Sequence, residues 1–535
     1  MNTAEFTIYD LIARNAALHA GREAVMGGGD SLTFGEFHRR CDAFAAGLRG
    51  EGLAAGDRIA LLAGNEPDFL LLCGAAALLG VIVVPVNWRL GSEEMVYILA
   101  DTAPRFLFCS GEFRDQARRA AAGTTCLEKR FVFAGDGEGA AAAVTGTSGV
   151  EAGRDDFLAW PPEEFNAAHV SSSPAAGRGA DPFLIIHTAA VGGKPRGCVL
   201  SQDNLMATAV QLAHLLRLDD RDSYVGLLPL FHIGGLAMTL ATMLACGRNI
   251  LVPQFDPPAV LRLIAASGGT FFGTFPPMMG ALLDAEEQGE YDTAGLRLAC
   301  GMDAPATIER FLRSHPRAEF FGLYGQTEVM PISGGNYRDC PGSIGRPSLL
   351  ARVAICDDLN EEVPPGTTGE ICVRSPAVFR GYWRLPGETA AAARSGRHHT
   401  GDLGRLDGDG FLWYAGRKPE KELIKTGGEN VYPAEVEKAI LAHGALAEAC
   451  VFGVPDPEWG EAVQAVCVIA EGGRVSAGEL GDFVAARIAR YKKPKHVIFV
   501  AALPKTPAGN IDREAVKATW GRKCLTGGNA GGRSA

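Results

Sequence analysis

The chain has 535 residues, of which 47% are hydrophobic and 21% are charged. This length exceeds one compact core, so we expect a large domain, divided into subdomains, and a smaller second domain. The formal net charge of −11 argues against non-specific nucleic-acid binding, because an acidic surface repels phosphates. Taken alone, the charge otherwise indicates only solubility.

The cysteines and the apolar segments point to a cytoplasmic protein with reduced thiols. The 13 cysteines are scattered and form no CxxC pair, and the N-terminal residues lack an apolar signal core. Residues 69–86 (FLLLCGAAALLGVIVVPV) are apolar enough to suggest a membrane span. Gly80 instead divides a small-residue helix from a β-branched strand, and Pro85 suits the end of that strand. We therefore expect no membrane span.

The first part of the chain alternates helical and strand patterns. Residues 31–33, followed by FGEFHRRCDAFAAGLRG, predict a capped amphipathic helix that ends at Gly50. A turn and a short buried strand follow at 56–65, and then the helix and strand of residues 69–86. This alternation predicts an α/β fold with parallel sheets covered by helices.

The residue composition changes twice in the later part of the chain. Residues 135–180 are rich in Ala, Gly and Ser and predict a loose surface excursion. Beyond Gly416, the pattern predicts a helix, two strands and a helix of a small α+β domain, at 434–443, 449–455, 462–470 and 477–491. We predict an N-terminal domain at 1–417, a hinge at 418–426, a small mobile domain at 427–520 and a disordered tail at 521–535.

The first motif with chemical meaning is HTAAVGGKPRGCVLSQDNL, residues 187–205. An apolar strand enters a Gly-Gly turn that carries Lys194 and Arg196, and a helix is predicted from Ser201. Backbone N–H groups and two cations can hold a polyphosphate. The Walker pattern GxxxxGK[ST] is absent from the sequence, and a plain strand and turn is an equally good interpretation.

Three further motifs are each ambiguous alone. In GLYGQTEVM, Tyr324 offers a flat face for a base and Glu328 a carboxylate for Mg²⁺, although a polar turn is the alternative. In HTGDLGRLDGDGFLWYAGRK, Asp402 can accept hydrogen bonds from both ribose hydroxyls, or form an Asx turn. The turn at 427–430 (GGEN) precedes a helix and can be a simple connection.

Together, in this order, the motifs resemble the adenylate-forming superfamily: acyl-CoA synthetases, adenylation domains of peptide synthetases and firefly luciferase. The resemblance runs from about residue 8 to residue 520. It includes LPLFHIGGL, GSIGRP, GEICVRSPAVFRGYW and GGENVYPAEVE, at 228–236, 342–347, 369–383 and 427–437. It implies an acid–thiol ligase that uses ATP, Mg²⁺ and coenzyme A. A carboxylate attacks the α-phosphate of ATP to give acyl-AMP and pyrophosphate; the small domain then rotates, and the thiol of CoA displaces AMP.

The resemblance also implies roles for residues at matching positions. Tyr324 stacks near adenine, Asp402 binds the ribose and Arg417 contacts the nucleotide. Thr327 contacts the α-phosphate, and Glu328 is the Mg²⁺ ligand. The implied catalytic residues are Thr327, Glu328, His232, Lys505 and Asn510. The implied cofactor-binding residues are Thr188, Gly192, Gly193, Lys194, Arg196, Gly301, Met302, Asp303, Tyr324, Gly325, Asp402, Arg417, Gly427, Gly428 and Glu429.

The acyl site is implied by Phe231 and His232. The histidine either orients the carboxylate or is a structural residue. Apolar residues at 274–283 and 329–331, with adaptable methionines, favour an aliphatic, alicyclic or aromatic acid, as in fatty acid metabolism. CoA is favoured over a carrier protein because no carrier domain is attached. The oligomeric state, including a homodimer, is left open.

The chain departs from the family pattern at three places. The phosphate loop, TSGTTGxPKG in the family, reads TAAVGGKPRG here; it has lost three hydroxyls, and Arg196 replaces the usual lysine. PKTxxGKIxR reads PKTPAGNIDR, so Asn510 replaces a lysine whose charge is worth roughly 3–4 kcal/mol by analogy with oxyanion donors. Lys505 and Arg513 are candidate substitutes. The hinge is longer than usual, with Lys421 or Glu422 as the pivot.

These departures leave two hypotheses. In the first, the chain is a ligase with a reworked phosphate site. In the second, adenylation is impaired, and the protein binds nucleotide or acyl-CoA as a sensor or partner, or performs only the thioester half-reaction. Oxidative chemistry of the luciferase type is a third class that no residue here identifies.

Overall fold

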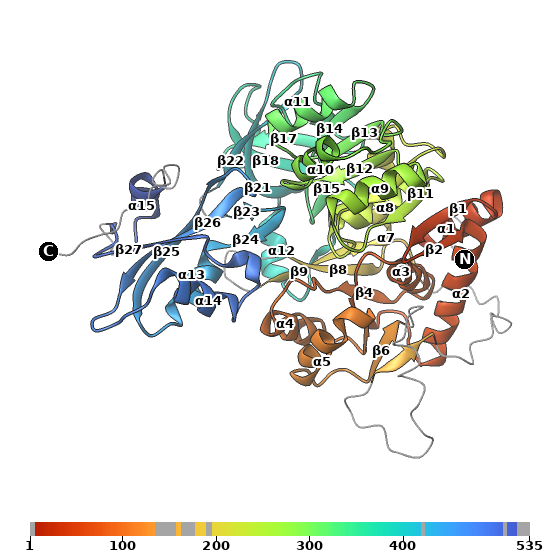
Figure 1. Ribbon diagram of the computed structural model, residues 1–535, viewed down its shortest axis with the longest axis horizontal. Coiled ribbons are helices and arrows are strands. Elements are labelled where there is room, and N and C mark those ends of the chain that lie inside the picture. Colours follow the sequence, from red (N-terminus) through yellow and green to blue (C-terminus); the bar gives the residue numbers. More distant parts are fainter. Residues whose placement is uncertain are drawn as a thin grey trace, which may run out of the picture. The chain divides into compact units, whose positions relative to one another are not determined.

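The computed structural model describes residues 6–133, 157–161, 177–188, 195–418, 423–506 and 511–521 (Figure 1). The chain divides into two compact units. The larger unit contains residues 1–88, 95–188 and 196–418, and the smaller contains 89–94, 189–195 and 419–535. The fold class that the sequence predicts, α/β with a large N-terminal and a small C-terminal domain, is confirmed.

The first sheet of the larger unit is parallel at its centre and antiparallel at its edges. Its nine strands, counted over the described residues, run in the order β16 (Arg346–Pro347), β15 (Val329–Asn336), β14 (Glu319–Gln326), β13 (Leu298–Gly301), β12 (Phe271–Thr274), β10 (Ser223–Gly226), β11 (Arg248–Leu251), β1 (Glu23–Gly27) and β2 (Asp30–Thr33).

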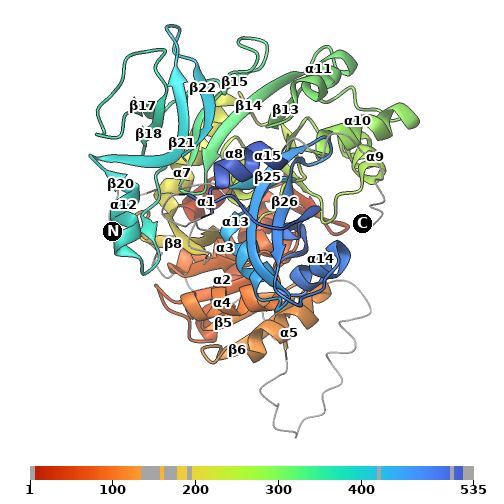
Figure 2. The same cartoon turned by 90° about the vertical axis from the view of Figure 1, so that its left-hand side faces the viewer.

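A second sheet has the same parallel centre. In the described part of the chain it contains eight strands in the order β19 (Gly381–Tyr382), β9 (Arg196–Ser201), β8 (Pro182–Thr188), β4 (Ile82–Pro85), β3 (Arg58–Leu62), β5 (Phe106–Cys109), β6 (Lys129–Phe133) and β7 (Leu158–Trp160). A third, antiparallel sheet contains β17 (Arg352–Cys356), β18 (Gly369–Arg374), β21 (Arg397–Leu406), β20 (Ala393–Arg394) and β22 (Leu412–Arg417) (Figure 2).

Helices cover both faces of the first two sheets. In the described residues before 418 these helices are α1 (Ile8–His19), α2 (Phe34–Gly50), α3 (Pro67–Leu79), α4 (Ser92–Thr102), α5 (Arg114–Ala122), α7 (Gln202–Leu215), α8 (Ile233–Leu244), α9 (Pro257–Ser267), α10 (Met278–Gln288), α11 (Pro305–Ser314) and α12 (Pro386–Ala392), with a 3₁₀ turn η1 (Gly111–Phe113). Alternate strand residues face different cores: Phe271 packs in the core that includes α7 and α8, and Phe272 packs against α9, α10 and α11.

Local sequence signals explain two of the predicted elements. Helix α2 begins after Thr33, whose side chain accepts the N–H of Glu36 in a capping box, so the predicted helix is confirmed. The apolar segment at 69–86 forms the buried α3, which ends at Gly80 with φ of 72°, and then β4. None of the helices in the described ranges is both long and apolar enough to cross a membrane.

One prediction about the larger unit is wrong where the structure can test it. Residues 158–160, within the predicted surface excursion, form β7 and pair with β6. Trp160 is fully buried and packs edge-on against Phe44, Phe108 and Phe131. The strand is only three residues long, so its alternation was hidden by the surrounding Ala, Gly and Ser. Residues 134–156 and 162–176 lie outside the described residues.

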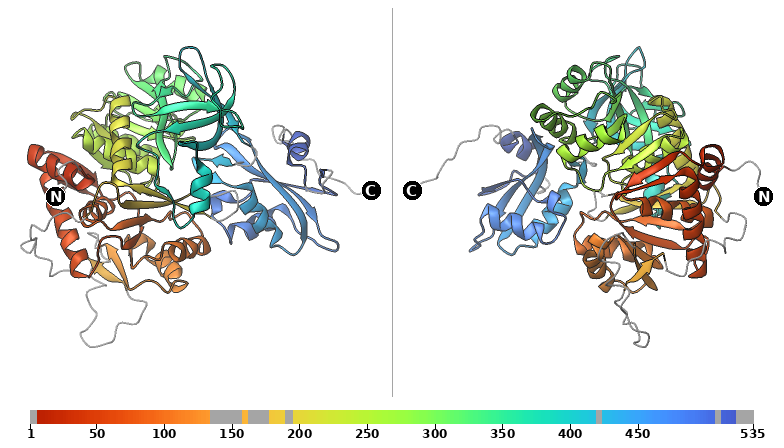
Figure 3. Two further views of the ribbon diagram at one scale, coloured as in Figure 1. Left: turned by 180° about the vertical axis from the view of Figure 1, so that it is seen from behind. Right: turned by 45° about the vertical axis from the view of Figure 1, so that its right-hand side comes forward.

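The smaller unit is an α+β structure, drawn in blue in Figure 3. Its sheet has the order β24 (Glu429–Val431), β23 (Ile424–Thr426), β26 (Gly460–Ile469) and β25 (Leu446–Asp456), with β27 (His496–Val500) parallel to β26. Its helices are α13 (Pro433–Leu441), α14 (Ala477–Ala485) and α15 (Arg513–Trp520). The helix predicted at 477–491 is shorter than expected, because α14 ends at Ala485 and the chain is extended at Ala489 before the 3₁₀ turn η4 (Arg490–Lys492).

Candidate functional site

The parallel strands of the first sheet end together and bring the adenine-flanking segment beside the YGQTE motif. Thr274, Gly301 and Gly322 lie side by side in the register of β12, β13 and β14. Gly301 has φ of +132°, and a Cβ there would lie 2.1 Å from the carbonyl oxygen of Thr274. Glycine is therefore required where two strand ends approach this closely. Met302, the next residue, is 41% exposed.

Asp303 follows at the same strand end. Its Oδ1 accepts the N–H of Ala304 at 2.9 Å. Burial raises the pKa of Asp303 to about 6, and the hydrogen bonds from Ala304 and Thr307 only partly oppose this shift. The structure therefore places a carboxyl group of raised pKa in the predicted adenine segment, next to the exposed Met302.

A buried acceptor forms the centre of the site. Asp402, on β21, is 6% exposed. Its Oδ2 accepts the hydroxyl of Tyr324 at 2.7 Å and the side-chain amide of Gln326 at 2.9 Å. Its Oδ1 lies 3.3 Å from Nε of Arg417, its cross-strand neighbour on β22. The structure thus brings together three residues that the sequence predicted as nucleotide ligands, Tyr324, Asp402 and Arg417.

Gln326 is a polar residue that the sequence reasoning did not assign. It also donates to the carbonyl of Thr400 at 2.9 Å and therefore ties β14 to β21. The only available signal was its place inside the YGQTE motif. Gly325, within the same motif, lies on β14, and an added Cβ would be 3.0 Å from the carbonyl of Val329 on β15.

Thr327 and Glu328 form the two-residue turn between β14 and β15. The turn exposes Thr327 partly, whereas Glu328 is 8% exposed. Tyr382 donates its hydroxyl to Oε1 of Glu328 at 2.7 Å, and the N–H of Phe379 donates to the carbonyl of Glu328 at 2.8 Å. Burial, and then the charge of Glu328, raise the pKa of Tyr382 well above its ordinary value, so this hydroxyl stays a donor. Tyr382 is a second residue that sequence reasoning did not assign.

The base of the predicted phosphate loop lies beside Tyr382. Thr188 ends β8 and Arg196 begins β9, so these cross-strand partners stand at the loop end of the β8–β9 hairpin. The guanidinium of Arg196 stacks over the ring of Tyr382 at 4.2 Å, and its NH1 pairs with Glu388 at 2.5 Å. Arg196, which replaces the family lysine, is therefore held beside Tyr382, and Tyr382 in turn donates to Glu328. Gly192, Gly193 and Lys194 lie outside the described residues.

His232 stands at the entry of α8. It is the N-cap residue of that helix, is half-buried and makes no side-chain cap bond. Its ring lies 4.6 Å from that of Phe231, which packs edge-on against Trp88 at 6.1 Å. These aromatic contacts agree with the prediction that Phe231 and His232 wall an acyl site. That His232 orients the carboxylate stays a prediction.

The glycine-rich motif of the smaller unit is a tight turn between β23 and β24. Gly427 and Gly428 have φ of +55° and +83°, as a two-residue hairpin turn with both residues in the left-handed region requires. A Cβ on Gly427 would lie 2.6 Å from the ring of Trp459. Glu429 begins β24 and is 6% exposed.

The two cations that were candidates to replace the lysine lost at 510 are already paired. Lys505 contacts Glu448 at 2.5 Å. Arg513 donates to the carbonyl of Val451 at 2.6 Å and pairs with Glu437 at 2.7 Å. These contacts lie within the smaller unit, so each cation must leave a carboxylate before it can serve elsewhere. Asn510 and the two pivot candidates, Lys421 and Glu422, lie outside the described residues.

Comparisons with known proteins identify the same family as the sequence motifs. The model of the family described as "AMP-binding enzyme" matches residues 12–383, and that of the "AMP-binding enzyme C-terminal domain" matches residues 435–510. An indoleacetate–CoA ligase from Aromatoleum aromaticum is 33% identical over 96% of this chain and 98% of its own length. A feruloyl-CoA synthase from Amycolatopsis is 34% identical over 95% and 98%. The structure of an o-succinylbenzoate CoA synthetase variant from Bacillus subtilis has a TM-score of 0.78 at 26% identity, covering 96% of this chain and 99% of that one.

Proposed function

The chain belongs to the AMP-binding enzyme family as an AMP-forming acid–CoA ligase, and on that premise we propose that it activates an apolar carboxylic acid as an acyl-AMP. The observation that carries the proposal is the buried acceptor Asp402. Two neutral donors and one guanidinium orient its carboxylate, and a ribose with two adjacent hydroxyls matches a carboxylate acceptor.

The nucleotide then lies along the strand ends. Tyr324 offers its ring to the adenine, Asp402 accepts the ribose hydroxyls, and Thr327 donates its hydroxyl to the α-phosphate. Arg196 supplies positive charge at the base of the phosphate loop, where Tyr382 holds its guanidinium. The acid enters past Phe231 and His232, so that its carboxylate meets the α-phosphate in line with the pyrophosphate leaving group.

Glu328 suits a magnesium ion. It is a hard oxygen ligand on a tight turn, and a hydrogen bond from Tyr382 to one of its oxygens fixes its orientation. Mg²⁺ commonly binds one or two carboxylates together with substrate phosphates, so one protein carboxylate is sufficient. The ion supplies charge neutralisation on the phosphates.

The acid class follows from the apolar surroundings and the relatives. Val329 and Met279 are buried and Met278 and Met330 partly buried, in three separate hydrophobic clusters, so the segments predicted to form the acyl region carry adaptable apolar side chains. The two relatives described above are named for indoleacetate and ferulate, which are aromatic carboxylic acids. We therefore place aromatic acids first, ahead of aliphatic ones.

The alternative is a protein with impaired adenylation. Its support is the loss of three hydroxyls from the phosphate loop, Asn510 in place of lysine, and the existing ion pairs of Lys505 and Arg513. Such a protein would bind nucleotide or acyl-CoA, or catalyse only the attack of CoA on a supplied acyl-AMP. We favour the complete reaction because the nucleoside contacts around Asp402 are present.

The test uses the full-length protein with ATP, Mg²⁺ and CoA. Indoleacetate, ferulate, a long-chain fatty acid and an amino acid are offered separately, and AMP and acyl-CoA are measured by mass spectrometry. Acid-dependent AMP with the matching acyl-CoA, highest for an aromatic acid, is the expected result. If the protein forms a thioester from synthetic acyl-AMP and CoA but not from any free acid with ATP, the result would support the alternative. A preference for the amino acid would overturn the proposed class of acid.

A further inference from the structure

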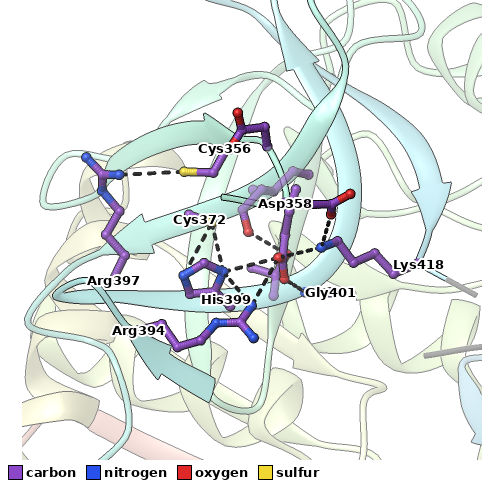
Figure 4. A network of polar contacts seen from close by, with 12 residues as sticks. Cys356, Asp358, Cys372, Arg394, Arg397, His399, Gly401 and Lys418 are labelled. Atoms are coloured by element: carbon purple, nitrogen blue, oxygen red, sulfur yellow. Dashed lines mark hydrogen bonds and ion pairs between the residues drawn. The ribbon is translucent and has the colours of Figure 1, made fainter. Parts of the chain in front are cut away.

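A second buried polar cluster lies on the antiparallel sheet, beside Gly401 and Lys418 (Figure 4). Glu370 on β18 and His399 on β21 are each 3% exposed. Oε2 of Glu370 lies 3.1 Å from Nδ1 of His399, 3.1 Å from Nζ of Lys418 and 3.5 Å from NH2 of Arg394. One carboxylate therefore stands among two cations and an imidazole.

The same cluster has the ligand types of a metal site, but its charges do not suit one. Glu370, Cys372 and His399 place one ligand atom each within 4.8 Å of one another. NH2 of Arg394 lies 3.1 Å from Nδ1 of His399, and Lys418 neutralises Glu370. Burial, and then the neighbouring Cys356, raise the pKa of the Cys372 thiol far above its ordinary value. A metal ion would have to displace two protein cations and a thiol proton.

The geometry of β21 shows what Glu370 does instead. Cys372 pairs with His399 and Glu370 pairs with Leu403, so two steps along β18 match four steps along β21. Strand β21 therefore carries two extra residues, a bulge that contains the Thr400–Gly401–Asp402 segment. A bulge redirects side chains and removes backbone groups from the ladder, and bulges are common beside active sites.

Glu370 satisfies the backbone group that this bulge removes from the ladder. Its Oε1 accepts the N–H of Gly401 at 2.9 Å. The carbonyl of Gly401 accepts the N–H of Lys418 at 3.0 Å, and the side chain of Lys418 returns to Oε2 of Glu370. Gly401, with φ of +70°, is thus held on both sides by one closed ring of contacts. The residue after Gly401 is Asp402, and the residue before Lys418 is Arg417.

Glu370 holds this ring as a carboxylate. Burial acts to raise its pKa, but hydrogen bonds from His399, Lys418 and Gly401 outweigh burial and lower the pKa. Loss of the charge would leave the buried N–H of Gly401 with a weaker acceptor and Lys418 without this counter-ion. Leaving buried donors poorly satisfied costs more than an average hydrogen bond contributes.

We propose that Glu370 is a positioning residue for the nucleotide site: it holds the β21 bulge so that Asp402 and Arg417 face the ribose. The inference rests on the proposed role of Asp402 as the ribose acceptor. Glu370 acts through the backbone of Gly401 and the side chain of Lys418, and it does not touch the substrate itself.

The test compares Glu370→Gln, Glu370→Asp and Lys418→Gln in the full-length chain. Glu362→Gln is the matched control, because Glu362 is an exposed carboxylate near the same sheet that pairs with Arg397. AMP binding is measured by calorimetry without turnover, together with the melting temperature. We expect Glu370→Gln to weaken AMP binding roughly tenfold, with smaller losses for Glu370→Asp and Lys418→Gln. The control should bind AMP as the unmodified protein does.

A double-mutant cycle separates positioning from general damage. If Glu370 acts through Asp402, the variant with both Glu370→Gln and Asp402→Asn binds AMP no more weakly than Asp402→Asn alone. Additive losses, or unchanged affinity in Glu370→Gln, would overturn the inference while leaving the proposed function intact. Stoichiometric zinc in the purified protein that is lost in Cys372→Ser would also overturn it. Should the unmodified protein bind no AMP at all, both the proposed function and this inference would fail.

Discussion

Asp402→Asn tests the central acceptor with the smallest change of shape. The substitution removes one negative charge and replaces one acceptor oxygen by an NH₂ group. Both neutral donors, the Tyr324 hydroxyl and the Gln326 amide, point at Oδ2. The amide oxygen of asparagine must therefore take that position, and its NH₂ group then faces Nε of Arg417, which lies 3.3 Å from Oδ1.

The magnitude follows from this arrangement. Two donors now face each other in a buried site, and an unsatisfied buried group costs about 1–3 kcal/mol. The melting temperature should therefore fall, by about 2–4 °C per kcal/mol in units of 150–250 residues and by less in this larger unit. The ribose loses a charged acceptor for one of its hydroxyls, which is worth about 1.5–3 kcal/mol, or roughly 10–100-fold in the Kd for AMP.

Titration calorimetry with AMP and a thermal melt measure the two effects separately. Asp407→Asn is the matched control, since Asp407 lies in the turn of the same β21–β22 hairpin, is half-buried and accepts the indole N–H of Trp413 at 2.7 Å. The control should leave the affinity for AMP unchanged. A folded Asp402→Asn protein that binds AMP as tightly as the control would refute the assignment of Asp402 as the ribose acceptor.

Three further predictions address the reaction, the strand ends and the pH dependence of stability. Asn510→Lys should change the rate of acid-dependent pyrophosphate release by less than about tenfold; a gain on the order of 100–1,000-fold would favour the adenylation-impaired hypothesis. Gly301→Ala places a Cβ 2.1 Å from the Thr274 carbonyl at φ of +132°, so it should lower the free energy of unfolding by more than about 2 kcal/mol, whereas Gly408→Ala, with open space around its Cβ, should not. Because the folded-state pKa of Glu370 is lowered, its stabilisation is present at neutral pH and is lost as the pH falls through that pKa. Denaturant titrations should therefore show a difference between the unmodified protein and Glu370→Gln that shrinks in acid; a constant difference would contradict an ionised Glu370.

Features that depend on neighbouring residues were readable from the sequence. The Thr33 capping box, the helix of α2, and the division of an apolar run at Gly80 into a helix and a strand all follow from local spacing. The α/β class followed from the alternation of such segments, because alternation leaves few ways to build a buried parallel sheet. The order of the motifs was sufficient to identify the family.

Only the tertiary structure decided which polar groups meet. Tyr382 and Glu328 are 54 residues apart, and Gln326 and Asp402 are 76 apart, so no local period connects them. The bulge in β21 and the contact of Glu370 with Gly401 depend on the register between two strands, which a hydrophobic pattern sets only as inside or outside. Trp160 was overlooked for the same reason: a three-residue strand is too short to show a period, and its burial comes from aromatic partners far along the chain. Sequence spacing specified the local elements and their order, while packing and strand register specified the contacts that make up the site.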